Sequence, residues 1–258
     1  IRYRLVGSEM CIRDRHKFLS KDHNVYLIAP KENCSGMSAA ISLRKEIEVK
    51  EISKNIFSVD GTPADCSYLG LLSVIPDSIE MIVSGINLGA NLGEDIFYSG
   101  TVGAAIAGRR LNYVPVAFSV TAFNPKNLSF ISEQASLIVN QVSKLPNDKN
   151  IIVNVNFPDL SSSKLNGTKL TMLGKRGTPD TPDLIGSNNS SKFYSFGPSG
   201  KLLPNQVDTD IQAIDDNYIS ISILDYNLSV DVSNWNFYRE VFNCCLLYTS
   251  PSPRDGNV

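Results

Sequence analysis

The first 160 residues alternate between apolar runs and segments with helical spacing. Four runs are mostly apolar, as in strands buried on both faces of a sheet: residues 25–29, 79–86, 114–120 and 151–157. Helical spacing is found at residues 62–72, 101–111 and 129–145, and residues 41–59 alternate as in an antiparallel ribbon. Strand alternating with helix predicts an α/β fold with an open, mostly parallel sheet.

The chain changes character after Pro158. Residues 161–210 are rich in Ser, Asn, Gly and Pro. Short strand-like pieces occur at 168–173, 192–196 and 218–224. Residues 230–242 have helical spacing. We therefore predict a three-layer core over residues 16–160 and an arm over residues 161–243, which carries a β-hairpin and either covers a site or joins subunits.

Residues 83–101 form the most informative stretch. A buried strand leads into a loop rich in Gly and Asn, and a helix begins near Ser99, Gly100 and Thr101. This arrangement can hold an anion, because the N–H groups at a helix start point at the ligand and glycines let the backbone approach. The amide oxygen of Asn87, at the end of the strand, can also ligate a divalent cation. An ordinary turn capped by Ser99 explains the same spacing, so both interpretations stay open here.

Length and composition narrow the class of protein. A chain of 258 residues with 42% hydrophobic and 19% charged residues suits one large domain, or a domain with a smaller appendage. A net charge of −2 gives no basic field that would attract nucleic acid polymers or an anionic membrane. No apolar run approaches the roughly 18 residues of a membrane span. Five cysteines without zinc spacing favour a reducing, cytoplasmic location.

The two ends of the sequence do not fit the patterns beside them. One string of about 33 nucleotides can encode residues 245–255, and its reverse complement, read from the third base, encodes residues 5–14. Two natural termini are not expected to match across opposite DNA strands. We therefore expect adaptor-derived, non-native segments at residues 1–15 and 244–258.

Nucleophilic catalysis through Cys or Ser has little support in the sequence. Three of the five cysteines fall in or beside the two end segments, which leaves Cys34 and Cys66. We expect both to be small buried or half-buried residues. The only histidines are His16 and His23, and neither lies within the motifs below.

Several separated motifs together resemble the SurE (survival protein E) family of metal-dependent nucleotidases, over nearly all of residues 16–243. The motifs are Ala29-Pro30 with Cys34-Ser35-Gly36-Met37-Ser38, Gly61-Thr62-Pro63-Ala64-Asp65-Cys66, residues 83–101, Asn154-Val155-Asn156-Phe157-Pro158, and Thr209-Asp210 before Tyr218-Ile219-Ser220. Each motif is weak alone, and the resemblance depends on their order and spacing.

The resemblance implies a Rossmann-like core and an arm exchanged between subunits, in a homodimer or homotetramer. It implies one divalent cation per subunit, Mg or Mn, and hydrolysis of nucleoside 5′- and 3′-monophosphates to nucleoside and phosphate. An exopolyphosphatase would use the same site. A catalytically silent nucleotide- or phosphate-binding protein is the alternative from another class.

The resemblance also implies site residues. Ser35 and Asn87 match metal ligands. The phosphate-contacting positions match Asn91, Ser99, Gly100 and Thr101. A metal and a helix start together can neutralise phosphoryl oxygens without a covalent nucleophile. The purely structural alternatives are that Ser35 is a turn residue and that Asn91 satisfies a loop backbone.

One departure from the family is serious. The family's first strand ends in an Asn-Asp-Asp-Gly turn whose aspartates bind the metal, and this chain has no such turn. No catalytic residue can therefore be identified, and Asp14, inside the non-native segment, is given no role. We expect the central first strand to be absent or mimicked by residues 3–7, and we expect divalent metal to bind poorly.

Overall fold

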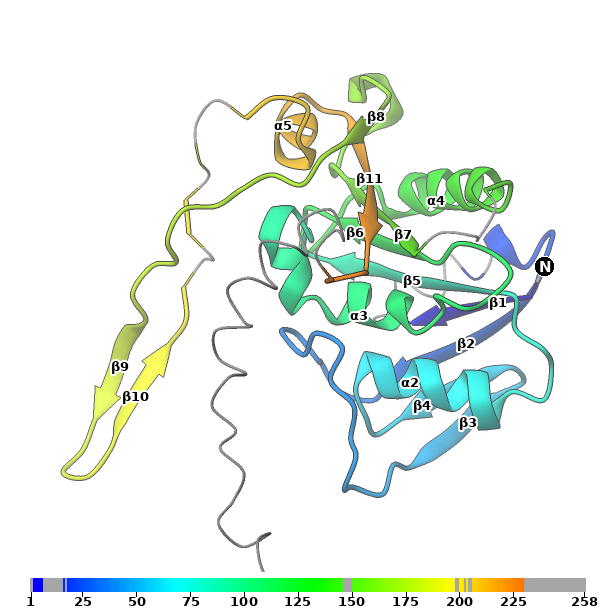
Figure 1. Cartoon of the computed structure of the whole chain (residues 1–258), viewed down its shortest axis with the longest axis horizontal. Coiled ribbons are helices and arrows are strands. Elements are labelled where there is room, and N and C mark those ends of the chain that lie inside the picture. Colours follow the sequence, from blue (N-terminus) through cyan, green and yellow to red (C-terminus); the bar gives the residue numbers. More distant parts are fainter. Residues whose placement is uncertain are drawn as a thin grey trace, which may run out of the picture. The chain divides into compact units, whose positions relative to one another are not determined.

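The computed structural model describes residues 2–6, 16, 18–145, 150–197, 200, 201, 203 and 206–229, with only the backbone described for residues 2–6. These residues form a nine-stranded sheet in the order β3-β4-β2-β1-β5-β6-β7-β11-β8 (Figure 1). The strands are β1 Arg2–Val6, β2 Asn24–Pro30, β3 Val49–Ser53, β4 Ile56–Val59, β5 Met81–Leu88, β6 Val116–Val120, β7 Ile151–Phe157, β8 Thr168–Thr171 and β11 Ile219–Asp225. From β4 to β7 all neighbours are parallel, which confirms the predicted α/β fold with a mostly parallel sheet.

β1 occupies the middle of this sheet. Tyr3 pairs with Val25 of β2 on one side and with Met81 of β5 on the other, both in parallel register. We expected the central strand to be absent or mimicked by residues 3–7, and residues 2–6 take that position. The strand therefore comes from the segment that we expect to be non-native.

Successive side chains of the parallel strands point to opposite faces of the sheet, and each face is covered by helices. The sheet is therefore the middle one of three layers. In β2, Val25 and Leu27 pack in the cluster that contains Ile131 and Ala135 of α4, Leu128–Val142. The intervening Ile28 packs against the other face. That face is covered by α2, Pro63–Leu69, and α3, Gly100–Ile106 (Figure 1).

The helices and the ribbon follow the predictions with shorter bounds. Thr62 caps α2 in a capping box with Asp65, and a π-helical turn, Gly70–Val74, extends it two residues past the predicted end at residue 72. The antiparallel ribbon is confirmed only for β3 and β4, because residues 41–48 form no strand. Ser42, in that stretch, instead binds the Asp65 carboxylate through its N–H and its hydroxyl, at 2.9 and 2.8 Å.

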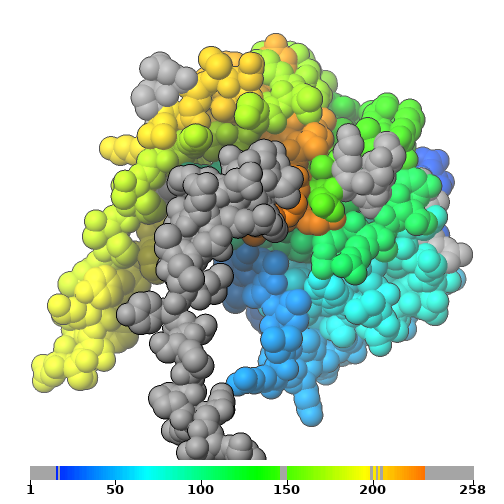
Figure 2. Space-filling model, in the orientation of Figure 1, coloured from blue at the N-terminus to red at the C-terminus, as the bar shows by residue number. Residues whose placement is uncertain are grey.

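Residues after 158 extend the sheet and form a separate hairpin. β11 pairs antiparallel with β7, and β8 pairs parallel with β11. β9, Asp183–Ser187, and β10, Lys192–Ser195, form a hairpin, and most of their residues are exposed (Figure 2). A hairpin was expected in the arm and β10 lies on the predicted piece 192–196, whereas the sequence did not predict β9 and the piece 168–173 joins the main sheet as β8. A short helix, α5, Asp210–Asp215, precedes β11. The division into a core of 16–160 and an arm of 161–243 remains a prediction.

By their contacts, the described residues up to Tyr226 form one compact unit. The helix predicted at 230–242 lies outside the described residues. Among those that are described, no helix has the length and apolar character needed to cross a membrane.

Candidate functional site

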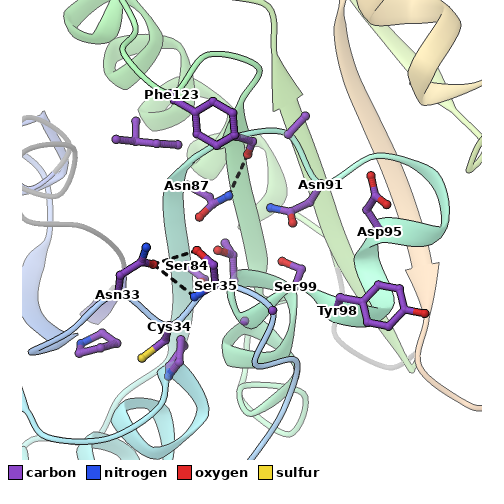
Figure 3. A pocket seen from close by; sticks show the side chains of 18 of the residues that line it. Asn33, Cys34, Ser35, Ser84, Asn87, Asn91, Asp95, Tyr98, Ser99 and Phe123 are labelled. Atoms are coloured by element: carbon purple, nitrogen blue, oxygen red, sulfur yellow. Dashed lines mark hydrogen bonds between the residues drawn. The ribbon is translucent and has the colours of Figure 1, made fainter. Parts of the chain in front are cut away.

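A pocket of about 550 Å³ opens where β2, β5 and β6 end at their carboxyl edges (Figure 3). Ligands of open α/β sheets bind at this edge. The six residues taken from the resemblance all line this pocket: Ser35, Asn87, Asn91, Ser99, Gly100 and Thr101. Ser35 comes from the loop after β2 and the other five come from residues 83–101, so the fold brings two segments of the chain together.

A bulge in β5 precedes Asn87 and sets its direction. Between the pairs Ser84–Ala117 and Asn87–Ser119, β5 contains one residue more than β6. Such a bulge re-aims the side chains that follow it. Gly85 lies in the bulge with φ of 92°, and a Cβ there would lie 2.0 Å from a carbonyl oxygen of β6. The bulge therefore requires glycine at this position.

Hydrogen bonds fix the orientation of Asn87 and of Ser35. The Asn87 amide donates from Nδ2 to the Gly89 carbonyl at 2.8 Å, so its Oδ1 is the atom available to a ligand (Figure 3). Ser35 donates from Oγ to Oδ1 of Asn33 at 2.8 Å, and the lone pairs of its oxygen remain available as acceptors. Both side chains thus offer a neutral oxygen in a fixed position.

The loop that carries Ser35 packs closely on the start of α3. Ser38 donates from its N–H to the Tyr98 carbonyl at 3.0 Å and from Oγ to the Phe97 carbonyl at 2.7 Å. Gly103 allows this approach, because a Cβ there would lie 2.4 Å from the Ser38 carbonyl oxygen. The helix start and the Ser35 loop are therefore positioned against each other.

Ser99 caps α3 and also lines the pocket. Its Oγ accepts the N–H of Val102 at 3.1 Å, as the simple capping interpretation requires. The N–H groups of Gly100 and Thr101, the first two residues of the helix, have no partner within it. The cap and the pocket lining are compatible, and these two N–H groups can bind an acceptor.

Two asparagines of β7, to which the sequence reasoning gave no role, hold the Asn91 loop. Asn156 accepts the Asn91 N–H at 2.9 Å and donates to the Asn91 carbonyl at 3.0 Å. Asn154 donates to the same carbonyl at 2.9 Å. The Asn91 side chain donates to Ser119 Oγ at 2.6 Å. All four side chains are buried, so the position of this loop is set by the sheet.

Asp210 is a second anchor that sequence reasoning missed. One carboxylate oxygen accepts the N–H of Gly93 at 2.7 Å, and the other accepts those of Gly174 and Ile211 at 2.8 and 2.9 Å. Burial raises the pKa of Asp210 above its ordinary value, although these N–H donors act to lower it. The carboxylate joins the site loop to the segments that flank the hairpin.

An ion pair also connects the segment that contains Gly174 and Arg176 to the wall of the pocket. Arg176 contacts Asp95, a pocket-lining residue, at 2.7 Å, with both side chains about one-fifth exposed. Arg176 also donates its N–H to the Glu94 carboxylate at 3.1 Å. Because the pair spans 81 residues of sequence, no local pattern could have predicted it.

The described residues supply only part of a divalent metal site. Ser35 and Asn87 offer neutral oxygens, whereas hard cations are held mainly by carboxylates. Asp95 is already paired with Arg176. Across the described ranges, no three His, Cys, Asp or Glu side chains cluster in a way that could hold a metal ion.

Cys34, at the pocket wall, is a protonated thiol and not an activated nucleophile. Burial raises its pKa, and the negative charges of Asp65 and Glu32 raise it further. Its Sγ donates to the carbonyls of Glu32 and Gly61, at 3.4 and 3.7 Å. Cys34 is half-buried and Cys66 is buried, as expected from the sequence.

The family model for Survival protein SurE matches residues 9–180, a range that includes the six predicted site residues. The chain belongs to the SurE family. It is 36% identical over 222 residues to the 5′-nucleotidase SurE of Vesicomyosocius okutanii subsp. Calyptogena okutanii, covering 84% of this chain and 88% of that protein. It is also 36% identical over 236 residues to the 5′/3′-nucleotidase SurE of Wigglesworthia glossinidia brevipalpis, covering 88% and 94%.

A solved structure agrees with the SurE assignment. The crystal structure of the SurE protein from Aquifex aeolicus matches with a TM-score of 0.80 at 28% identity, covering 93% of this chain and 99% of that one. The SurE fold therefore extends over nearly the whole chain, including the residues beyond the family-model match.

Proposed function

We propose that this protein is a phosphomonoesterase that hydrolyses nucleoside 5′- and 3′-monophosphates to nucleoside and phosphate. One observation carries the proposal. The six residues matched to the family's metal and phosphate positions converge on a single pocket at the carboxyl edge of the sheet. The names of the relatives, 5′-nucleotidase and 5′/3′-nucleotidase, support the same reaction.

In this proposal the start of α3 binds the phosphate. The N–H groups of Gly100 and Thr101 donate to phosphoryl oxygens, and the Thr101 hydroxyl can add a further donor. Asn91 lies beside them, with its backbone fixed by β7. These groups orient the phosphate without forming a covalent bond to it.

We propose that Ser35 and Asn87 are two neutral ligands of a divalent cation, Mg or Mn. When bound, such a cation neutralises charge on the phosphoryl oxygens and lowers the pKa of a bound water. Because neutral oxygens alone bind a hard cation weakly, the site also needs the acidic turn that the family has after its first strand. In this chain that turn is missing, so we expect the chain in its present sequence to be insoluble or inactive.

The missing acids favour a second candidate for the chain in its present sequence, a catalytically silent nucleotide- or phosphate-binding protein. Such a protein would keep the N–H donors of α3 and bind phosphate without hydrolysis. An exopolyphosphatase would use the same pocket and differ only in its substrate. Inorganic phosphate release separates hydrolysis from binding, and polyphosphate as substrate tests the third possibility.

We also propose that the chain assembles through its arm into a homodimer or homotetramer, and that it acts in the cytoplasm. The hairpin supports the assembly, because large apolar side chains are exposed on both of its strands. These are Leu184 and Ile185 on β9 and Phe193 and Tyr194 on β10. Light scattering of the full chain, with and without residues 183–195, measures the oligomeric state.

The test of the reaction compares this chain with one in which residues 1–15 are replaced by a strand ending in Asn-Asp-Asp-Gly and the start of the following helix. We expect metal-dependent phosphate release from nucleoside monophosphates only from the replaced chain. A matched control carries the same segment with both aspartates changed to asparagine, and it should be inactive. Turnover by the present chain, sensitive to EDTA and close to that of the replaced chain, would contradict this account.

A further inference from the structure

Phe123 is a large apolar residue that remains exposed at the wall of the pocket. Its side chain is 81% exposed, yet the residue lines the same pocket as Asn87 and Ser99 (Figure 3). The ring lies against Gly89, where a Cβ would come within 3.0 Å of its Cε1 atom. One part of the ring thus rests on backbone, and most of its surface is open.

The backbone around Phe123 is held at both ends. Thr121 donates its N–H to the Phe157 carbonyl at 2.9 Å. On the other side, the N–H groups of Lys126 and Asn127 donate to the Asp159 carboxylate at 2.9 and 3.0 Å. An aromatic residue on an anchored segment loses little conformational freedom when a ligand packs on it.

The polar side chains of the pocket lie between Phe123 and the start of α3. In the view of Figure 3, Asn87 and Asn91 lie between Phe123 and Ser99. A ligand with its phosphate at Ser99–Thr101 that extends past these amides meets the aromatic ring at its other end. Nucleobases suit this end, because each has a π-face that stacks on an aromatic side chain.

We propose that Phe123 stacks on the base of the nucleoside monophosphate, which makes nucleotides, and not small sugar phosphates, the favoured ligands. This inference rests on the proposed function for the position of the phosphate. Stacking does not depend on the pattern of hydrogen-bonding groups on a base, so the site should bind different bases with similar affinity.

Binding of three probes to the full chain tests the inference: adenosine 5′-monophosphate, adenosine and ribose 5-phosphate, each followed by ligand NMR. Phe123→Ala should weaken binding of the first two probes about 5- to 100-fold. It should leave ribose 5-phosphate unchanged, and Phe123→Trp should restore base binding. Phe97→Ala is the matched control, because Phe97 is also exposed, at 59%, but does not line the pocket.

Equal weakening of all three probes, or no weakening of any, would overturn the role of Phe123. Failure of adenosine to bind, with adenosine 5′-monophosphate binding no better than ribose 5-phosphate, would overturn it as well. The adenosine arm contains no phosphate and needs no hydrolysis. Loss of the proposed reaction would therefore leave this result unchanged, and the two proposals can fail separately.

Discussion

Replacing Asn156 by Leu tests whether β7 fixes the site loop. Asn156 is fully buried, and its amide makes two hydrogen bonds with the backbone of Asn91. Leu has a similar branched shape, so it fills the same space without the polar atoms. The substitution leaves the Asn91 N–H without its acceptor, whereas the Asn91 carbonyl keeps the donor from Asn154.

The cost follows from these two bonds. A buried N–H left unsatisfied costs about 1–3 kcal/mol, and loss of one of two donors to the carbonyl costs about 0.5–1.5 kcal/mol. Together these predict a loss of about 1.5–4.5 kcal/mol in the free energy of unfolding. With one of its anchors lost, Asn91 should also shift relative to Ser99, so we expect phosphate binding to weaken.

Urea unfolding followed by circular dichroism measures the stability, and titration with inorganic phosphate measures the binding. Ser132→Ala serves as the control, because Ser132 is equally buried but its Oγ has no hydrogen-bond partner among the described residues. We expect that control to keep or gain stability, because removing a buried hydroxyl without a partner breaks no hydrogen bond. No loss of stability for Asn156→Leu, with phosphate binding intact, would refute the anchoring role.

Two further predictions concern the packing and the charge around the site. Gly103→Ala should weaken phosphate binding and reduce stability by about 1–3 kcal/mol, because its Cβ would lie 2.4 Å from the Ser38 carbonyl oxygen. Gly177→Ala, with no atom closer than 3.6 Å to the new Cβ, is its control in the same unfolding assay. Burial raises the pKa of Asp65, but hydrogen bonds from two backbone N–H groups and two hydroxyls outweigh it and hold that pKa below its ordinary value of 3.8. Asp65 therefore stabilises the fold above pH 3.8 and loses this effect as the pH falls through its lowered pKa, so the stability difference from Asp65→Asn should shrink in urea unfolding below pH 4. A difference that stays constant down to pH 2 would contradict the lowered pKa.

The core strands could be predicted because parallel strands buried on both faces are apolar at nearly every position. The run 25–29 became β2, Asn24–Pro30, in this way. Residues 41–48 misled the same reasoning. They alternate as a strand does, but Ser42 binds Asp65, and this contact lies 23 residues away in sequence. Tertiary hydrogen bonds of this kind override a local pattern.

The sequence analysis quoted the segments that anchor the site only as motifs of the resemblance and gave their residues no role. Asn154 and Asn156 interrupt an otherwise apolar strand, and a buried amide requires partners. The pattern therefore indicates that two polar side chains bind something inside the fold, although it does not identify Asn91 as their partner. Arg176 and Asp95 gave no comparable signal, because each is an ordinary charged residue in a polar segment.

The topology also indicates where carboxylates could complete the proposed cation site. β1 lies between β2, whose following loop carries Ser35, and β5, whose bulge directs Asn87. A chain that leaves the carboxyl end of β1 starts between the segments that carry these two side chains, so carboxylates placed directly after β1 would lie close to the proposed cation site. In this sequence the two residues after β1 are Gly7 and Ser8, which carry no charge. We expect a substitute strand to be able to pair here, because backbone pairing depends little on side-chain identity, whereas cation binding depends on the particular side chains that follow.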